Sequence, residues 1–310
     1  MTAAAPLLAM QLPRLPPRTA RQLSSGRLLD VGVILGATAL LGVLVVRANV
    51  VLNHHWDWSV IGTYLVRTDP ATGAWEPNLI LQGFFTTIRL AAWSLLLGTV
   101  VGAVCAGLLV YGRPALRWLS RCFVEVVRDT PPIVLIFALY FFVSSQMMPL
   151  LGLQGDLTIA PGWLRATVAV VLAPPDRIND FLSGLACLAL LAGAYITEIL
   201  RAGLQSIPRA QTEAGYALGL RGWAVFRLVV LPQAVRNVLP ALAGQFIISI
   251  KDSSLVALIS IPELTYMTSE VSSSTQRFFE VWLFTAGLYF CVCFALSVLF
   301  GRLERRWRRA

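Results

Sequence analysis

Charged side chains are scarce in this sequence. They make up 13% of its 310 residues, whereas hydrophobic residues make up 57%. Soluble domains carry about 25% charged residues, so this chain cannot cover itself with a hydrated polar surface. The composition excludes an ordinary soluble domain and predicts an integral membrane protein whose solvent is the lipid bilayer.

Residues that bind metals or form disulfides are also few. The two histidines, His54 and His55, are adjacent in a loop, and the five cysteines are odd in number and lie mostly inside apolar runs. Buried cysteines of this kind behave as small hydrophobic residues. No Gly-rich phosphate loop ends in Gly-Lys-Ser/Thr, and no nucleophile stands beside a plausible base. The sequence therefore predicts a chain that is not an enzyme and that itself binds no metal, ATP or other cofactor.

Arginine accounts for the net charge of +9. The arginines stand at the ends of apolar segments and in loops rather than on one face, which favours membrane orientation over nucleic-acid binding. We therefore expect no nucleic-acid partner.

Six apolar segments reach the roughly 20 residues that cross a bilayer. They cover residues 28–50, 88–110, 131–153, 181–200, 238–261 and 281–301. A further apolar stretch, 162–173, is too short to span and contains Arg165. The expected fold is an all-α integral membrane protein with six transmembrane helices.

The arginine-rich segments all fall on one side of a six-span arrangement. They are the two ends of the chain, the connection between the second and third spans, and the connection between the fourth and fifth spans. The positive-inside rule then makes both termini cytoplasmic. Residues 1–27 and 302–310 are expected to be cytoplasmic tails and 51–79 an external loop. A cleaved signal peptide is the alternative for the first segment, but its apolar stretch ends at Arg47 without a clear cleavage site.

A short polar region between the fourth and fifth spans has an unusual pattern. Ser206 can cap a helix, with Pro208 in its first turn. Small residues then recur at helical spacing, after which Gly219 and Gly222 can end the helix. A second helix is expected over 223–231, stopped by Pro232. A narrow, smooth helix at a membrane surface is suited to lie in a groove of another protein.

This pattern resembles the EAA loop, the cytoplasmic coupling element of permease subunits in bacterial ABC importers. Gly215 replaces the usual second Ala, and Val229 stands for an Ile. The resemblance implies an ATPase-coupling loop over 206–232 whose contact residues are Ala210, Glu213, Ala214, Gly215, Ala217, Gly219 and Pro232.

Other segments resemble the permeases of the polar amino acid class, which carries His, Arg, Lys, Glu, Gln and opines. They are 128–131, 193–201, 206–211, 231–234 and 251–255, within a resemblance that covers residues 83–301. Asp129, Ala210 and Ser253 depart from the usual residues. The class implies a five-helix permease domain, here over 80–301, and makes 28–50 an added N-terminal helix.

The resemblance also implies partners and a location. It predicts two ABC ATPase subunits, which hold ATP and Mg, and a second permease subunit that is either identical or related. It further predicts a periplasmic amino-acid-binding protein and a multi-pass position in the bacterial inner membrane.

Charged residues inside the spans require a reason, since each costs a few kcal/mol or more at the bilayer centre. Glu198 and Arg201 lie one turn apart, and Lys251 and Asp252 interrupt the fifth span. Arg89 stands at the outer start of the second span, where it can snorkel or meet a substrate carboxylate. Arg89, Glu198, Lys251 and Asp252 are candidates for the substrate path, and structural ion pairing is the alternative.

Three functions remain open at this point. An ATP-driven importer of polar amino acids accounts for the coupling-loop pattern. An ion-coupled secondary transporter, or an ABC permease for another small polar solute, is the alternative, although no internal repeat is evident. A membrane scaffold or channel subunit gives no reason for the Glu213–Pro232 spacing.

Overall fold

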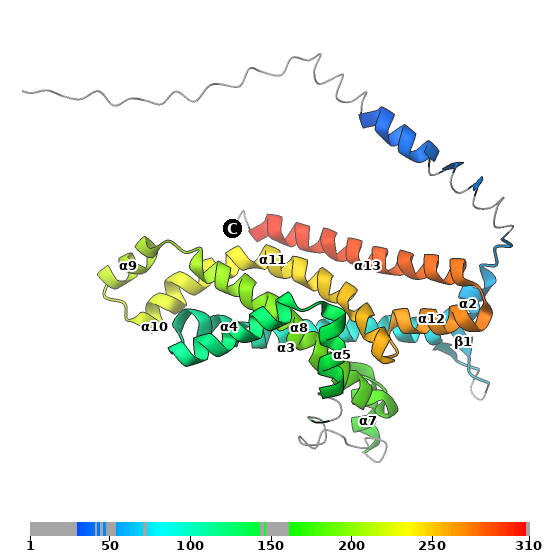
Figure 1. Ribbon diagram of the computed structural model, residues 1–310, viewed down its shortest axis with the longest axis horizontal. Coiled ribbons are helices and arrows are strands. Elements are labelled where there is room, and N and C mark those ends of the chain that lie inside the picture. Colours follow the sequence, from blue (N-terminus) through cyan, green and yellow to red (C-terminus); the bar gives the residue numbers. More distant parts are fainter. Residues whose placement is uncertain are drawn as a thin grey trace, which may run out of the picture. The chain divides into compact units, whose positions relative to one another are not determined.

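The computed structural model describes residues 30–40, 42–43, 46–47, 54–70, 73–142, 146 and 161–307. The chain separates into two compact units, residues 1–56 and 57–310. Figure 1 traces their helices along the sequence.

The first unit contains an apolar helix, Asp30–Leu40, within the expected first span. Its Thr38 hydroxyl donates to the Ile34 carbonyl oxygen at 2.7 Å. Such an internal bond satisfies a hydroxyl where no water is available. Several of residues 41–50 lie outside the described part, so the length of this span stays a prediction.

Among its described residues, the second unit contains four helical segments that are long and apolar enough to cross a membrane. They are Leu79–Tyr111, Pro175–Gln205, Gly222–Ile259 and Phe278–Arg305. Their main helices are α3 (Leu79–Tyr111), α8 (Ile178–Gln205), α11 (Leu231–Asp252) and α13 (Phe278–Trp307), which run alongside one another in Figure 1. They match the second, fourth, fifth and sixth expected spans.

Helix α3 packs closely on α8 because small residues meet at their crossing. A Cβ atom on Gly98 would lie 3.0 Å from Ala192 Cβ, and one on Gly102 would lie 2.7 Å from Ile196 Cγ2. Small residues at such crossings let membrane helices approach closely and gain dispersion contacts. This packing places α8 at the centre of the unit.

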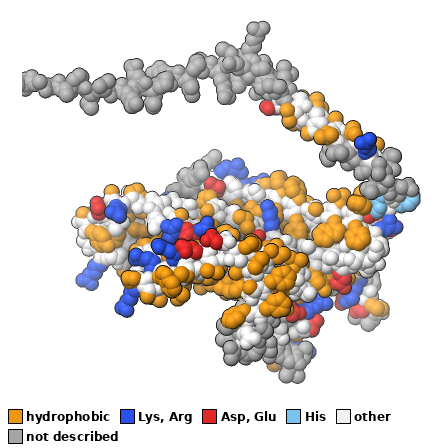
Figure 2. All heavy atoms as spheres, in the orientation of Figure 1, with side chains coloured by type: hydrophobic (Ala, Val, Ile, Leu, Met, Phe, Trp, Pro, Cys, Tyr) orange, Lys and Arg blue, Asp and Glu red, His pale blue; other side chains and the backbone are white. Residues whose placement is uncertain are grey.

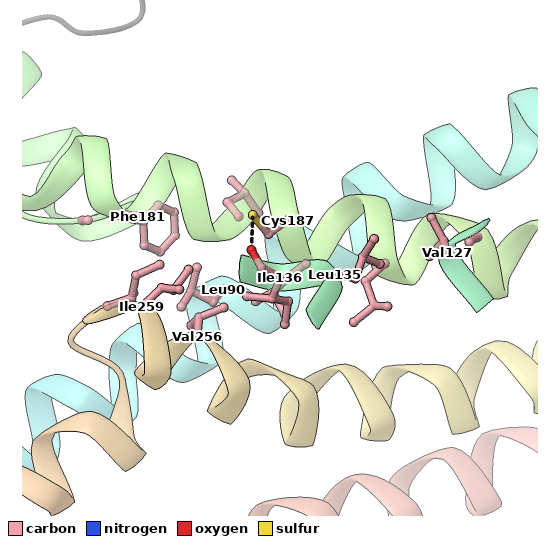
Figure 3. Packing of buried hydrophobic residues seen from close by; sticks show 14 of the residues in the cluster. Leu90, Val127, Leu135, Ile136, Phe181, Cys187, Val256 and Ile259 are labelled. Carbon is pink, nitrogen blue, oxygen red and sulfur yellow. Dashed lines mark hydrogen bonds between the residues drawn. The ribbon is translucent and has the colours of Figure 1, made fainter. Parts of the chain in front are cut away.

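The main core surrounds the N-terminal half of α8 (Figure 3). Phe181 and Cys187 of α8 contact residues of α3, of α5 (Pro132–Phe142) and of the 3₁₀ segment η5 (Ser253–Ile259). The Cys187 thiol donates to the Ile136 carbonyl oxygen across 4.0 Å. Cys187 therefore acts as a small buried residue, as its position in an apolar run predicts.

The third expected span is described only in part. Helix α4 (Pro114–Asp129) ends before Thr130 and Pro131, and α5 follows. Proline disfavours helical backbone in the preceding residue, which explains the break. Residues 143–145 and 147–153 lie outside the described part, so the six-span count stays a prediction. Helix α7 (Gly162–Val171) has 10 residues, which agrees with a stretch too short to span.

The expected external loop contains regular structure. Helix α2 (Ser59–Leu65) leads into an antiparallel pair of strands, β1 (Val66–Thr68) and β2 (Trp75–Pro77). Arg67 and Glu76 face each other across the pair, with a guanidinium–carboxylate distance of 3.0 Å. The predicted helical fold class is confirmed, and the structure adds to it this small hairpin, which cross-strand pairing stabilises.

Two further segments complete the second unit. Helix α9 (Arg209–Ala217), helix α10 (Gly222–Val225) and the π-helix η4 (Phe226–Val230) join α8 to α11. Helix α12 (Leu264–Thr275) joins η5 to α13. In Figure 1, α9 and α10 lie at one end of the long helices and α12 and α2 at the other.

Candidate functional site

The connection between α8 and α9 differs from the expected capping. Ser206 does not start α9. It closes α8, with φ −73° and ψ −13°, and its hydroxyl donates to the Gly203 carbonyl oxygen at 2.8 Å. Ser206 Oγ also accepts a hydrogen bond from Asn237 Nδ2 at 2.9 Å. Because Ser206 keeps helical backbone angles, it cannot serve as the extended cap of the next helix, and Pro208 takes that position without a side-chain bond.

Helix α9 presents one face of small residues to solvent. Ala210, Glu213, Ala214 and Ala217 are all exposed. Their spacing of three, four and seven residues places them on a single helical face. Gly215, on the opposite face, is buried, and a Cβ there would lie 3.1 Å from Val225 Cγ2. Gly215 thus lets α9 rest on α10, and the Ala expected at this position would crowd that contact.

Gly219 ends α9 as predicted. Its φ is +78°, in the left-handed region. The backbone N–H of Leu220 donates to the Gly215 carbonyl at 3.2 Å, and that of Leu218 donates to the Ala214 carbonyl at 3.1 Å. Glycine adopts this conformation at little cost and so satisfies the last carbonyls of the helix.

Pro232 does not stop a helix, contrary to the expectation. The helical path runs from Gly222 through η4 into α11, and Pro232 lies in the first turn of α11. Proline fits there because its missing N–H is not required in a first turn. The π-helix before it spaces the backbone bonds differently and so accommodates the ring. The result is one continuous helical path from Gly222 to Asp252.

Sequence reasoning missed three large side chains near this face. Tyr216, Leu218 and Trp223 are 53%, 81% and 71% exposed. Large apolar side chains that stand together in solvent often mark an interaction surface. Their positions in the short polar connection around Gly219 could have indicated this surface from the sequence. Apolar residues in such a short connection cannot form a hydrophobic core of their own.

Glu198 and Arg201 form the ion pair that their spacing suggests. Arg201 Nη2 lies 2.6 Å from Glu198 Oε2, and Arg128 of α4 approaches the same carboxylate at 3.9 Å. Arg201 Nη1 also donates to Gln205 Oε1 at 2.7 Å. Charged side chains gather over α4 and α8 in Figure 2. The network joins α4 to the last turns of α8, just before helix α9.

Lys251 and Asp252 lie where α11 changes into η5. Lys251 is exposed, whereas Asp252 is half-buried. The hydroxyls of Ser253 and Ser254 donate to the carbonyl oxygens of Ile250 and Lys251 at 2.7 and 2.6 Å. These bonds satisfy backbone groups at the change of helix type, as the Ser pair predicts. Both charged residues remain candidates for the path.

Arg89 points to backbone rather than to an open surface. Its Nη1 donates to the carbonyl oxygens of Ala169 and Leu172 at 3.1 and 3.3 Å. Trp93 Nε1 donates to the neighbouring Val171 carbonyl at 2.9 Å. Cations are stabilised at the carboxyl end of a helix, and these bonds hold the end of α7 on α3. Contact of Arg89 with a substrate stays a prediction.

A buried carboxyl, Glu263, was not singled out from the sequence. It caps α12 by accepting from Tyr266 N at 2.8 Å, and it also accepts from Thr87 Oγ1 at 3.1 Å and Tyr289 Oη at 2.9 Å. It therefore ties α12 to α3 and α13. Glu263 lies between the spanning segments, and burial raises the pKa of its carboxyl although these donors act in the opposite direction.

Within the described ranges, no group of three or more His, Cys, Asp or Glu residues is arranged to hold a metal ion.

Comparison with known proteins shows the family to which this sequence belongs. The family model of binding-protein-dependent transport system inner membrane components matches residues 98–309. The chain is 32% identical over 230 residues to the glutamine transport system permease protein of Escherichia coli, covering 74% of this chain and 93% of that protein. It is 31% identical over 223 residues to the arginine ABC transporter permease protein of Escherichia coli, covering 72% and 92%.

A solved structure is also similar. The chain superposes on a crystal structure of an amino acid ABC transporter with histidines, with a TM-score of 0.62 and 26% sequence identity. The match covers 82% of this chain and 100% of that chain.

Proposed function

Because this chain belongs to the family of binding-protein-dependent transport system inner membrane components, we propose that it is the permease subunit of an ATP-driven importer of polar amino acids. It is a multi-pass protein of the inner membrane. Its relatives include a glutamine transport system permease protein and an arginine ABC transporter permease protein, which supports a polar amino acid as the substrate.

The exposed face of α9 carries this proposal. Ala210, Glu213, Ala214 and Ala217 lie together in solvent while Gly215 holds the opposite face against α10. A small-residue face with one carboxylate suits a groove that supplies a donor for Glu213. We assign this groove to an ATPase subunit, which binds ATP and Mg. A complete importer then contains two such ATPases, a second permease subunit and a periplasmic binding protein.

Two rigid connections transmit a displacement of α9 into the spans. One is the continuous helical path from Gly222 to Asp252. The other is the contact of Ser206, at the end of α8, with Asn237 of α11. Closure of the ATPases on ATP would move both spans together because they are linked at the coupling loop. The ATPases shift the permease between inward-facing and outward-facing states by binding the two states with different affinity.

Lys251 and Asp252 are the residues that we assign to the path, with Glu198 and Arg89 as further candidates. Both lie deep in a span, where an isolated charge is costly. We expect Asp252→Ala alone to lower uptake and expression, because it strands Lys251. The Lys251→Ala/Asp252→Ala double variant should recover expression yet transport slowly if the pair lines the path. Full recovery of uptake in radiolabelled amino acid assays would instead assign the pair to structure.

The deciding experiment replaces the carboxylate of the docking face. Glu213→Lys should abolish co-purification of the ATPase and ATP-dependent uptake in proteoliposomes while the permease still inserts. Glu270→Lys is the matched control, since Glu270 is exposed on α12 at the other end of the unit, and it should retain the ATPase. Retention of the ATPase by Glu213→Lys would refute the docking assignment. Uptake driven by an ion gradient without any ATPase would favour the secondary transporter.

A further inference from the structure

Gln245 places a hydrogen-bond donor in the buried part of a span. It lies in α11, two turns before Asp252, and it is only 4% exposed. Within the described part of the chain, its Nε2 atom has no hydrogen-bond partner. A buried amide left in this condition costs free energy, and a span offers no bulk water to relieve it. An unpaired group of this kind in a native protein requires an explanation.

The helix against which Gln245 packs presents apolar side chains to it. Val238 lies seven residues before Gln245 on the same face of α11, and it faces Gly203 of α8. The end of α8 contacts the start of α11, so the two helices run in opposite directions. On α8, the face of Gly203 continues to Ile199 and Ile196, which lie one and two turns away. Neither side chain can accept a hydrogen bond, and the backbone carbonyls there accept within the helix.

An exposed stripe runs along α11 beside Gln245. Its spacing of three, four and three residues places it on one helical face. It consists of Ala241, Gly244, Ile248 and Lys251. The exposed faces of α3 and α13 carry large apolar side chains instead, such as Val100 and Phe290. Lipid tails are apolar, whereas small residues and a lysine in a span suit a close protein contact or a water-filled path. The stripe is therefore suited to continue the path to which Lys251 is assigned.

Gln245 lies at the edge of this stripe. Ala241 is one turn before it and Ile248 is three residues after it, and both are exposed. A helical side chain leans toward the turn that precedes it, so the amide of Gln245 is directed toward the turn of Ala241. The small Ala241 side chain leaves room for rotation of the Gln245 side chain to bring Nε2 onto the stripe. An acceptor met there removes the cost of the unpaired donor.

We propose that Gln245 determines which amino acids the permease accepts, by donating from Nε2 to a carbonyl oxygen at the end of the substrate side chain. This inference rests on the proposed function. Lys251, about 9 Å farther along the helix axis, offers a full positive charge to the α-carboxylate, for which a charged donor is the stronger partner. The substrate class is then glutamine and glutamate. The side chains of arginine and lysine contain only donors and leave Nε2 unpaired.

Direct binding of amino acids to the purified permease–ATPase complex, without the binding protein, tests this assignment. In equilibrium dialysis, radiolabelled glutamine or glutamate should bind about tenfold more tightly than arginine, the order expected for one hydrogen bond. Gln245→Leu should remove this preference by weakening the binding of glutamine and glutamate alone. Gln245→Glu should reverse it, because a carboxylate accepts hydrogen bonds from a guanidinium group.

Gln233→Leu is the matched control. Gln233 lies on the same helix, but its Nε2 already donates to the Val229 carbonyl oxygen at 2.8 Å, so its replacement should leave the preference unchanged. The preference is a ratio of two affinities and does not depend on the fraction of folded protein. Gln245→Leu should also unfold at the parent's temperature or above it, because it removes an unpaired donor.

Two results would overturn the proposal. Equal weakening of glutamine and arginine binding in Gln245→Leu would show that Nε2 meets the shared α-carboxylate instead. A parent complex that binds no amino acid, or binds them without preference, would exclude this site from selection. ATP-dependent uptake by the complete importer would then still support the proposed function, whereas the absence of both binding and uptake would refute the function as well.

Discussion

At the scale of single residues, Glu198 takes part in a polar network near the cytoplasmic end predicted for α8. Its carboxylate meets Arg201 and Arg128 from two helices, and Arg201 reaches on to Gln205. These contacts favour the structural alternative, in which the carboxylate holds α4 against α8. A substrate ligand would instead leave part of its bonding capacity free for the substrate.

Charge exchange separates these two roles. Glu198→Arg should destabilise the protein by about 1 kcal/mol, the order expected for a partly exposed ion pair, because it places like charges together. The double variant Glu198→Arg/Arg201→Glu should recover thermal stability and uptake if the pair is structural. Recovery of stability without recovery of uptake would assign Glu198 to the path. Glu125→Arg, at an exposed site on α4, is the control.

Glu263 predicts a pH dependence of stability. Burial raises the pKa of its carboxyl in the folded state above the unfolded value, so the folded protein binds the proton more tightly. The stabilisation from this group is then present at low pH and is lost as pH rises through the folded pKa. The temperature of thermal unfolding in detergent should therefore fall as pH rises above about 4.5, which is near the usual pKa of Glu.

The neutral variant supplies the control for that measurement. Glu263→Gln has no carboxyl to titrate, so its unfolding temperature should vary less with pH over the same interval. An identical pH profile in the variant and the parent would show that another group is responsible.

At the scale of elements, the contact between α3 and α8 depends on glycine. A Cβ on Gly102 would lie 2.7 Å from Ile196 Cγ2 and 3.1 Å from the backbone nitrogen of Thr197. Overpacking of this kind costs about 1–3 kcal/mol, which exceeds the gain of up to about 1 kcal/mol from helix propensity. Gly102→Ala should therefore lower the thermal stability of the protein.

Gly107 is the matched control on the same helix, because a Cβ there would meet nothing within 4 Å. Gly107→Ala should leave stability unchanged or raise it. If both variants behave alike, the close crossing of α3 and α8 is not the source of the effect.

The coupling region shows how neighbouring elements change a local expectation. Pro232 alone predicts the end of a helix, yet the π-helix Phe226–Val230 before it lets the helical path continue. Ser206 alone predicts a helix start, yet it completes α8 and bonds to Asn237. Whether each residue starts, continues or ends a helix depends on the conformation of the neighbouring backbone. A short window of sequence does not specify that conformation.

At the scale of the whole molecule, the arrangement of arginines predicts that the coupling loop and the hairpin lie on opposite sides of the membrane. A cysteine at Thr212 should react with a membrane-impermeant maleimide only from the cytoplasmic side. One at Thr68 in β1 should react only from outside. Cys291, which is exposed, should be replaced by Ser in both variants. Reaction of both cysteines from the same side would contradict the six-span topology.

The sequence by itself determined that this protein lies in a lipid bilayer. It also determined the four spans that the structure describes and the position of the turn at Gly219. These follow from short-range physics: apolar runs of sufficient length must leave water, and a glycine with left-handed backbone ends a helix wherever it occurs. The resemblance of residues 83–301 to permeases of the polar amino acid class could also be recognised from the sequence alone.

Only the tertiary structure decided which partners each polar group has. Thr87 and Tyr289 donate hydrogen bonds to the buried carboxylate of Glu263, and Arg89 donates to the end of α7. Each of these contacts joins residues that lie far apart in the sequence. The physical reason is that hydrogen bonds and packing depend on distances of a few ångströms in space, which residue spacing does not specify when the chain folds back on itself.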